Sequence, residues 1–171
     1  MRRGLPGLLC ALAAATMAHS QTPIEVVVHN FIQPSGYYPA AGLTRDAAGN
    51  LYGTTVYGGT ANRGVVYKLD NAGYTVLYSF PGGAAGSGPY AGAVRDAKGN
   101  FYGSTTYGGG ADAVYKVSPD GQETVLHSFT GGADGGSPVA SVTFSPAGDL
   151  YGTAENGGAN GDGAIFKVTP R

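Results

Sequence analysis

The sequence 50-NLYGTTVYGGT-60 occurs again, with changes, as 100-NFYGSTTYGGG-110 and 149-DLYGTAENGGA-159. An apolar segment follows each copy: VVYKL from residue 65, AVYKV from residue 113 and AIFKV from residue 164. Phe31, Phe80 and Phe129 recur at a spacing of 49 positions. Self-similarity at a fixed period indicates a repeat architecture. Residues 21–171 therefore form one repeat domain, with repeats at about 26–74, 75–123 and 124–171.

Each repeat contains four short segments that favour β-strand. In the second complete unit they read GAVRD, NFYGSTT, AVYKV and TVLYSF or its copy TVLHSF, rich in Val, Tyr, Phe and Thr and separated by Gly, Pro and Asp. No segment has a helical period. Four strands in about 40 to 50 residues, repeated in tandem, are typical of a propeller blade. The sequence therefore predicts an all-β, β-propeller-like fold of three four-stranded blades; a β-solenoid or an open stack of sheets is the alternative.

Glycine also recurs within the second segment, as Gly53, Gly103 and Gly152. A glycine inside a strand often marks a point where another backbone comes close. We expect these three glycines to face the backbone of a neighbouring blade. The Asp of the turns DAAGN and DAKGN, which is Asp46 in the first unit and Asp96 in the second, is expected to cap its turn by accepting backbone N–H bonds.

The frame of the repeats predicts an N-terminal strand offset. If a blade runs from GLTRD to TVLYSF, residues 26–31 (VVVHNF) form an outer strand before the first complete blade, and the last blade has only three strands. Closed propellers have about four to eight blades, so three blades form a partial propeller. A homodimer formed by strand exchange would close six blades and cover the unpaired edges. A truncated fragment of a longer propeller is the alternative.

Residues 1–20 have the regions of a secretory signal peptide: two early arginines, an apolar run and the small-residue cleavage site Ala18-His19-Ser20. The apolar run is shorter than the roughly 20 residues that cross a bilayer. We therefore expect a secreted or periplasmic protein with no membrane anchor in the mature chain.

Removal of residues 1–20 leaves 171 minus 20, or 151, residues without cysteine, so disulfides do not stabilise this domain. Loss of the two N-terminal arginines lowers Lys plus Arg from 10 to 8 against 11 acidic residues, a net charge of minus 3. Binding to nucleic acid depends on positive charge that neutralises phosphates. The mature chain has no basic cluster, and nucleic acid is therefore not an expected partner.

The succession GNLYGTT, GG, GVVYKL and TVLYSF resembles the GloVer tandem repeat, which is found in exported bacterial proteins that use one of several surface anchors. The resemblance covers residues 26–171, with three copies of the pattern in register. It implies a propeller-like repeat on a secreted or surface protein, and it assigns no activity. The chain departs from that pattern because it has few repeats and shows no anchor, so surface attachment does not follow.

The candidate ligand-binding residues are tyrosines in the Gly-rich loops at one end of the predicted blades. Aromatic rings beside polar loop groups can stack on sugars, although tyrosine also packs between blades with its hydroxyl in water. The third unit weakens the first interpretation, because Val139 and Asn156 stand where the second unit has tyrosine. The candidates are Tyr37, Tyr38, Tyr57, Tyr90 and Tyr107.

No catalytic residue, metal ligand or cofactor is predicted. His29 and His127 lie two residues before the repeat Phe, a position that Tyr78 occupies in the middle unit, and this exchange indicates packing. Zinc needs three or four clustered ligands, and the Gly-rich loop at residues 157–163 offers too few oxygens for calcium. Neither a nucleophile elbow nor a phosphate-binding loop occurs.

The sequence thus favours an exported repeat protein that acts as a binding or interaction scaffold, with a glycan or a surface protein as partner. A hydrolase or lyase with active residues in the channel loops is the alternative, on analogy with other propellers alone.

Overall fold

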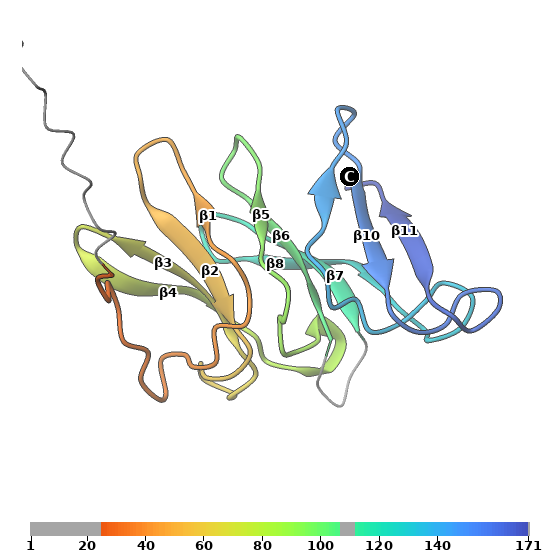
Figure 1. The fold of residues 1–171 in the computed structure, drawn as a ribbon, viewed down its shortest axis with the longest axis horizontal. Helices are drawn as coiled ribbons and strands as arrows, with labels where there is room; N and C mark the ends of the chain where they lie inside the picture. The colour runs from red at the N-terminus through yellow and green to blue at the C-terminus, as the bar shows by residue number, and fades with distance from the viewer. Residues whose placement is uncertain (1–24, 107–111, 171) are drawn as a thin grey trace, which may run out of the picture.

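The computed structural model describes residues 25–106 and 112–170 (Figure 1). The predicted signal peptide and Tyr107 lie outside the described residues. Within them the fold is all β, and the single helical element is a 3₁₀ turn, η1 (Gly83–Ala85). The prediction of an all-β chain is therefore confirmed.

The strands form three antiparallel sheets whose strands follow the order of the sequence. The first sheet contains β1 (Thr44–Arg45), β2 (Leu51–Thr55), β3 (Val65–Asp70) and β4 (Gly73–Ser79). The second sheet contains β5 (Val94–Arg95), β6 (Phe101–Thr105), β7 (Ala113–Val117) and β8 (Glu123–Ser128). The third sheet contains β9 (Thr143–Phe144), β10 (Leu150–Ala154) and β11 (Ala164–Val168). The first two sheets each correspond to one predicted blade, so their outer strands β4 and β8 come from the start of the next repeat, and even the β-bulge at Val66/Tyr67 recurs at Val114/Tyr115.

The recurring glycines of the second strands approach a ring and not a backbone. Gly53, Gly103 and Gly152 pair with the aromatic residue of the next strand, which is Tyr67, Tyr115 and Phe166 respectively. A Cβ atom on Gly103 would lie 2.5 Å from the Tyr115 hydroxyl oxygen, and one on Gly152 would lie 2.3 Å from Phe166 Cζ. The expectation of a neighbouring backbone was wrong, because the ring of the same sheet folds across the glycine.

The turn between the first two strands of a sheet has the predicted cap. Asp46 accepts hydrogen bonds from the Asn50 backbone N–H at 2.9 Å, the Asn50 side chain at 2.9 Å and the Tyr52 hydroxyl at 2.9 Å. These bonds, led by the one from the Asn50 side chain, lower the pKa of Asp46 to about 2. Asp96 accepts the same three bonds in the second sheet. Both carboxylates therefore serve the turn.

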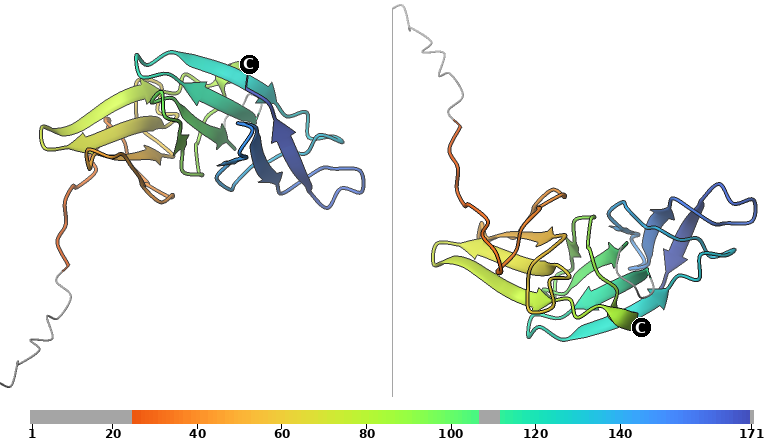
Figure 2. Two further views of the ribbon diagram at one scale, coloured as in Figure 1. Left: turned by 90° about the horizontal axis from the view of Figure 1, so that it is seen from above. Right: turned by 90° about the horizontal axis from the view of Figure 1, so that it is seen from below.

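The three sheets pack face to face in a row (Figure 2). One apolar cluster joins the first sheet to the second and includes Tyr52, Val66, Phe80 and Tyr115. A second cluster joins the second sheet to the third and includes Val114, Phe129 and Phe166. We call these two contacts the interior seams.

The row of sheets is open, and it does not close into a ring (Figures 1 and 2). Two of the three sheets have the predicted four strands, whereas the third has three. Residues 26–31, expected to form an outer strand, form none, because no strand lies beside them within the described chain. Val26, Val27 and Val28 are instead 70%, 66% and 71% exposed.

Candidate ligand-binding site

The loop before β1 and the loop after β2 pair with each other at one end of the first sheet. The Tyr37 N–H donates to the Tyr57 carbonyl at 3.0 Å, and the Tyr57 N–H donates to the Tyr37 carbonyl at 3.3 Å. The Val56 N–H donates to the Tyr38 carbonyl at 3.1 Å. These loops lie at the end opposite the β1–β2 turn (Figure 1). Both loops were predicted to lie at the same end of the blades, and the backbone pairing brings their tyrosines together.

Four of the five candidate tyrosines form one continuous group of rings. The rings of Tyr37 and Tyr57 stack with centroids 5.4 Å apart, and Tyr38 contacts Tyr57 at 6.0 Å and Tyr90 at 6.3 Å. We call these four residues the tyrosine cluster. Tyr90 comes from the second repeat, so the cluster spans the loops of two neighbouring sheets. The fifth candidate, Tyr107, lies outside the described residues.

Tyr38 adopts the left-handed backbone conformation, with φ of 63°. The equivalent positions are Gly88, with φ of 62°, and Ser137, with φ of 51°, so the fold requires this conformation in every unit. A bulky residue with positive φ is uncommon and costs on the order of 1–3 kcal/mol. The sequence could not reveal this feature, since tyrosine is no signal for positive φ.

The two central rings of the cluster are open to solvent. Tyr38 is 57% exposed and Tyr57 is 38% exposed, whereas Tyr37 and Tyr90 are half-buried. The third unit repeats the loop pairing with polar side chains, because Asn156 Nδ2 donates to Ser137 Oγ at 3.0 Å. The aromatic surface therefore belongs to the first two units.

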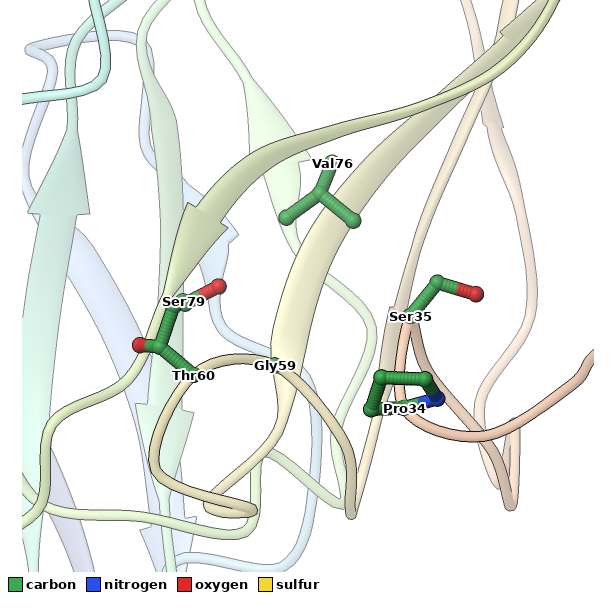
Figure 3. Close-up of a pocket in the computed structure, with 6 residues that line it drawn as sticks. All are labelled: Pro34, Ser35, Gly59, Thr60, Val76 and Ser79. Carbon is green, nitrogen blue, oxygen red and sulfur yellow. The ribbon is translucent and has the colours of Figure 1, made fainter.

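A cavity of about 420 Å³ lies on the outer side of the same loops (Figure 3). Its wall includes a bond in which the Gly59 N–H donates to the Pro34 carbonyl at 2.7 Å. Tyr74 supports this wall, since its hydroxyl donates to the Ser35 carbonyl at 3.1 Å, and burial raises the pKa of Tyr74 to about 12. The lining is formed by Pro34, Ser35, Gly59, Thr60, Val76 and Ser79. It offers hydroxyl groups and apolar surface and has no titratable side chain.

The described histidines contact aromatic rings. His29 stacks on Tyr74 with centroids 4.5 Å apart, and His127 contacts Phe129 edge-on at 4.7 Å. His127 Nε2 also lies 3.3 Å from Asp134 Oδ2, and Asp134 in turn accepts a hydrogen bond from the Thr130 hydroxyl. Because this hydroxyl bonds the carboxylate and not the imidazole, the three groups do not form a nucleophile and its base.

No group of three or more His, Cys, Asp or Glu residues lies close enough to hold a metal ion in the described ranges. The part of the chain that the structure describes also contains no helix long and apolar enough to cross a membrane.

These features define a class: an all-β tandem-repeat protein with an aromatic loop surface between its first two units. The whole repeat region matches the family described as the Gloeobacter/Verrucomicrobia repeat, over residues 14–171. The chain therefore belongs to this repeat family, as the sequence pattern indicated. None of the curated proteins compared with the chain matches it.

Proposed function

We propose that the protein is an exported binding protein and that the tyrosine cluster is its glycan-binding surface. The observation that carries the proposal concerns Tyr38. Its ring is 57% exposed, and its backbone adopts a positive φ that a bulky residue rarely adopts. Strained residues persist where the surrounding structure holds them, and they gather at ligand sites.

The fold itself gains little from this side chain. In the second unit Gly88 adopts the same conformation without a side chain, and in the third unit Ser137 does so with a small one. The Tyr38 ring meets the rings of Tyr57 and Tyr90 in T-shaped pairs, at centroid distances of 6.0 and 6.3 Å. Glycine adopts this backbone conformation at the lowest cost. An exposed aromatic ring at such a position therefore supports a role in ligand binding.

The chemistry of the surface suits a neutral sugar. Tyrosine offers an apolar ring face and a polar hydroxyl, and the two half-open rings of Tyr38 and Tyr57 present both together. A pyranose has a matching pattern, with C–H groups on one face and hydroxyls around its edge. Binding residues are often carried by loops on a rigid scaffold, and the paired loops here fix the backbone of three of the four tyrosines.

The test replaces Tyr38 with asparagine, a residue that tolerates positive φ. Tyr38→Asn removes the ring and relieves strain, so we expect thermal stability to hold or rise while glycan binding falls about tenfold or more, which corresponds to about 1.4 kcal/mol. The readouts are a glycan array and then calorimetry with the best-bound sugar.

Tyr57→Ala serves as a second variant, and Val139→Ala is the control, because Val139 is an exposed apolar loop residue of the third unit. Retained binding in both tyrosine variants would refute the proposal, and so would equal loss in the control. Export is tested separately, by sequencing the N-terminus of the protein recovered outside the cytoplasm, which should begin at Gln21.

A further inference from the structure

We propose that the open faces of the two end sheets form a third seam between two copies of the chain. In this seam, residues 26–31 of one copy are the fourth strand beside β11 of the other copy. This inference does not rest on the glycan proposal, but the proposed seam lies next to the tyrosine cluster, since Gly88, the equivalent of Tyr38, donates across the first interior seam to the Arg63 carbonyl at 2.9 Å.

The outward face of the third sheet carries residues that are buried in both interior seams. Tyr151 is 37% exposed, while its equivalents Tyr52 and Tyr102 are 7% and 5% exposed. Ile165 is 81% exposed, while its equivalents Val66 and Val114 are fully buried. The outward face of the third sheet therefore carries the residues of an interior seam, but no following sheet covers them.

The same face has an unused hydrogen-bonding position. Thr54 Oγ1 donates across the first interior seam to the Ala91 carbonyl at 3.1 Å, and Ser104 Oγ donates across the second to the Pro138 carbonyl at 2.8 Å. The equivalent residue of the third sheet is Thr153, which is exposed. By the same spacing, Thr153 would donate to the backbone at residues 39–41 of a second copy.

The outward face of the first sheet carries the complementary half. Leu43 is 55% exposed, while its equivalents Ala93 and Val142 are 6% and 2% exposed because the preceding sheet covers them. Tyr67 lies on this face, since its equivalent Tyr115 faces the preceding sheet. The two open faces therefore carry, at these positions, the equivalents of residues that meet in the interior seams, although Tyr67 is already buried in the single chain.

Residues 26–31 pack against the first sheet in the same way as the end of a preceding sheet packs against the next one. The Phe31 ring contacts the Tyr67 ring at 5.2 Å and 70°, as Phe80 contacts Tyr115 at 5.0 Å and 69°. Phe80 directly follows β4, the outer strand of the sheet that precedes Tyr115. Phe31 therefore has the position of the residue that follows the fourth strand of a sheet. Residues 26–30 would form that fourth strand if a third strand lay beside them.

The repeat predicts the register of the missing pairing. In the first sheet Val65 pairs with Ser79 and Val66 with Tyr78. The equivalents are Ala164 opposite Asn30 and Ile165 opposite His29. The same spacing holds in the second sheet, where Ala113 pairs with Ser128 and Val114 with His127.

A single copy cannot make this pairing, because residues 26–31 and β11 lie at opposite ends of the row (Figures 1 and 2). In this proposal a second copy supplies the partner. Two copies would contribute six sheets, within the range of about four to eight that closed propellers contain. The arrangement is a head-to-tail contact that closes after two chains and pairs the strand edges that the row leaves open.

The first test measures the mass of the protein without residues 1–20 by light scattering at micromolar concentrations. We expect twice the chain mass, and Ile165→Lys should give a monomer with an unchanged far-ultraviolet spectrum, because Ile165 is 81% exposed. Val139→Lys, which places the same charge on an exposed apolar residue of the same unit, should remain a dimer. A monomeric parent protein would overturn the proposal, as would an assembly larger than two chains.

The second test is a disulfide between chains. Directly opposed residues of antiparallel strands have Cβ atoms about 4.5–5.5 Å apart, near the distance that a disulfide bridges. Cysteine-free mature chains that carry either Asn30→Cys or Ala164→Cys are mixed and oxidised mildly. We expect a crosslinked pair in the mixture and much less in each variant alone, and crosslinking that Ile165→Lys leaves unchanged would contradict the seam.

Discussion

The ring of Phe80 packs edge-on against the ring of Tyr115, with centroids 5.0 Å apart, and both side chains are fully buried. Phe80 follows the outer strand of the first sheet, and Tyr115 lies in the third strand of the second. Phe129 meets Phe166 in the same way in the next seam, at 5.0 Å and 67°. One aromatic pair per repeat therefore attaches each sheet to the next.

Phe80→Ala should destabilise the protein strongly, since truncation of a buried Phe costs about 3–5 kcal/mol. Phe31→Ala removes the equivalent ring at the open end, where Phe31 is only half-buried, and should cost clearly less. Urea unfolding of both substitutions in the Ile165→Lys background, where we expect a single chain with an open end, measures the difference. Equal losses would mean that the interior seam contributes no more than the open end.

Tyr115→Phe should leave stability unchanged or raise it by about 1 kcal/mol. The Tyr115 hydroxyl is buried and has no hydrogen-bond partner among the described residues, and an unsatisfied buried group carries a desolvation penalty. The third unit already has phenylalanine here, as Phe166. Tyr67→Phe is the comparison at the open face, and thermal unfolding is the measurement. A clear loss of stability in Tyr115→Phe would reveal a partner for the hydroxyl, such as bound water.

The sequence predicted the strands well because their signals are local and occur three times. Val, Tyr and Thr runs, the glycine turns and the capping Asp46 each specify a few consecutive residues, and every copy repeats the specification. Residues 26–31 have the same strand composition and still form no strand. A strand needs hydrogen bonds from a neighbour, and the composition of a segment does not state where its neighbour lies.

The candidate site was predictable in its residues and not in its geometry. Glycine-rich loops with tyrosines marked Tyr37 and Tyr57 as candidates, although 20 residues separate them. Their stacking depends on the backbone pairing of the two loops. Tyr38 also has a positive φ. Only the second unit gives a sequence signal for this conformation, because glycine occupies the equivalent position there.

Gly103→Ala should destabilise the protein by about 1–3 kcal/mol, the usual cost of overpacking a core. Its new Cβ would lie 2.5 Å from the hydroxyl oxygen of Tyr115, a buried ring that has little room to move. Gly42→Ala is the control, with both substitutions made in the single-chain Ile165→Lys background, because a Cβ there meets nothing within 4 Å of the same chain. Gly42→Ala should stay within about 0.5 kcal/mol of the parent in urea unfolding. Similar effects of both substitutions would show that the ring does not restrict Gly103.

Asp46 gives a prediction for acid stability. The hydrogen bond from the Asn50 side chain, with further bonds from Tyr52 and the backbone, lowers the pKa of Asp46 from 3.8 to about 2 in the folded protein. A carboxyl whose pKa falls on folding stabilises the fold above its unfolded pKa, and this stabilisation is lost as the pH falls through the folded value. Asp46→Asn should therefore lower the melting temperature at pH 6, and the gap to the parent should shrink between about pH 4 and pH 2.

Ser145→Ala provides the control for this measurement, because Ser145 holds the equivalent turn of the third unit through a hydroxyl that accepts the Asp149 N–H at 3.2 Å. A hydroxyl does not titrate in this range, so the gap between Ser145→Ala and the parent should not change with pH. Melting curves of both variants and the parent at four or five pH values separate the two cases. A gap for Asp46→Asn that persists unchanged at pH 2 would show that the turn depends on the shape of the side chain and not on its charge.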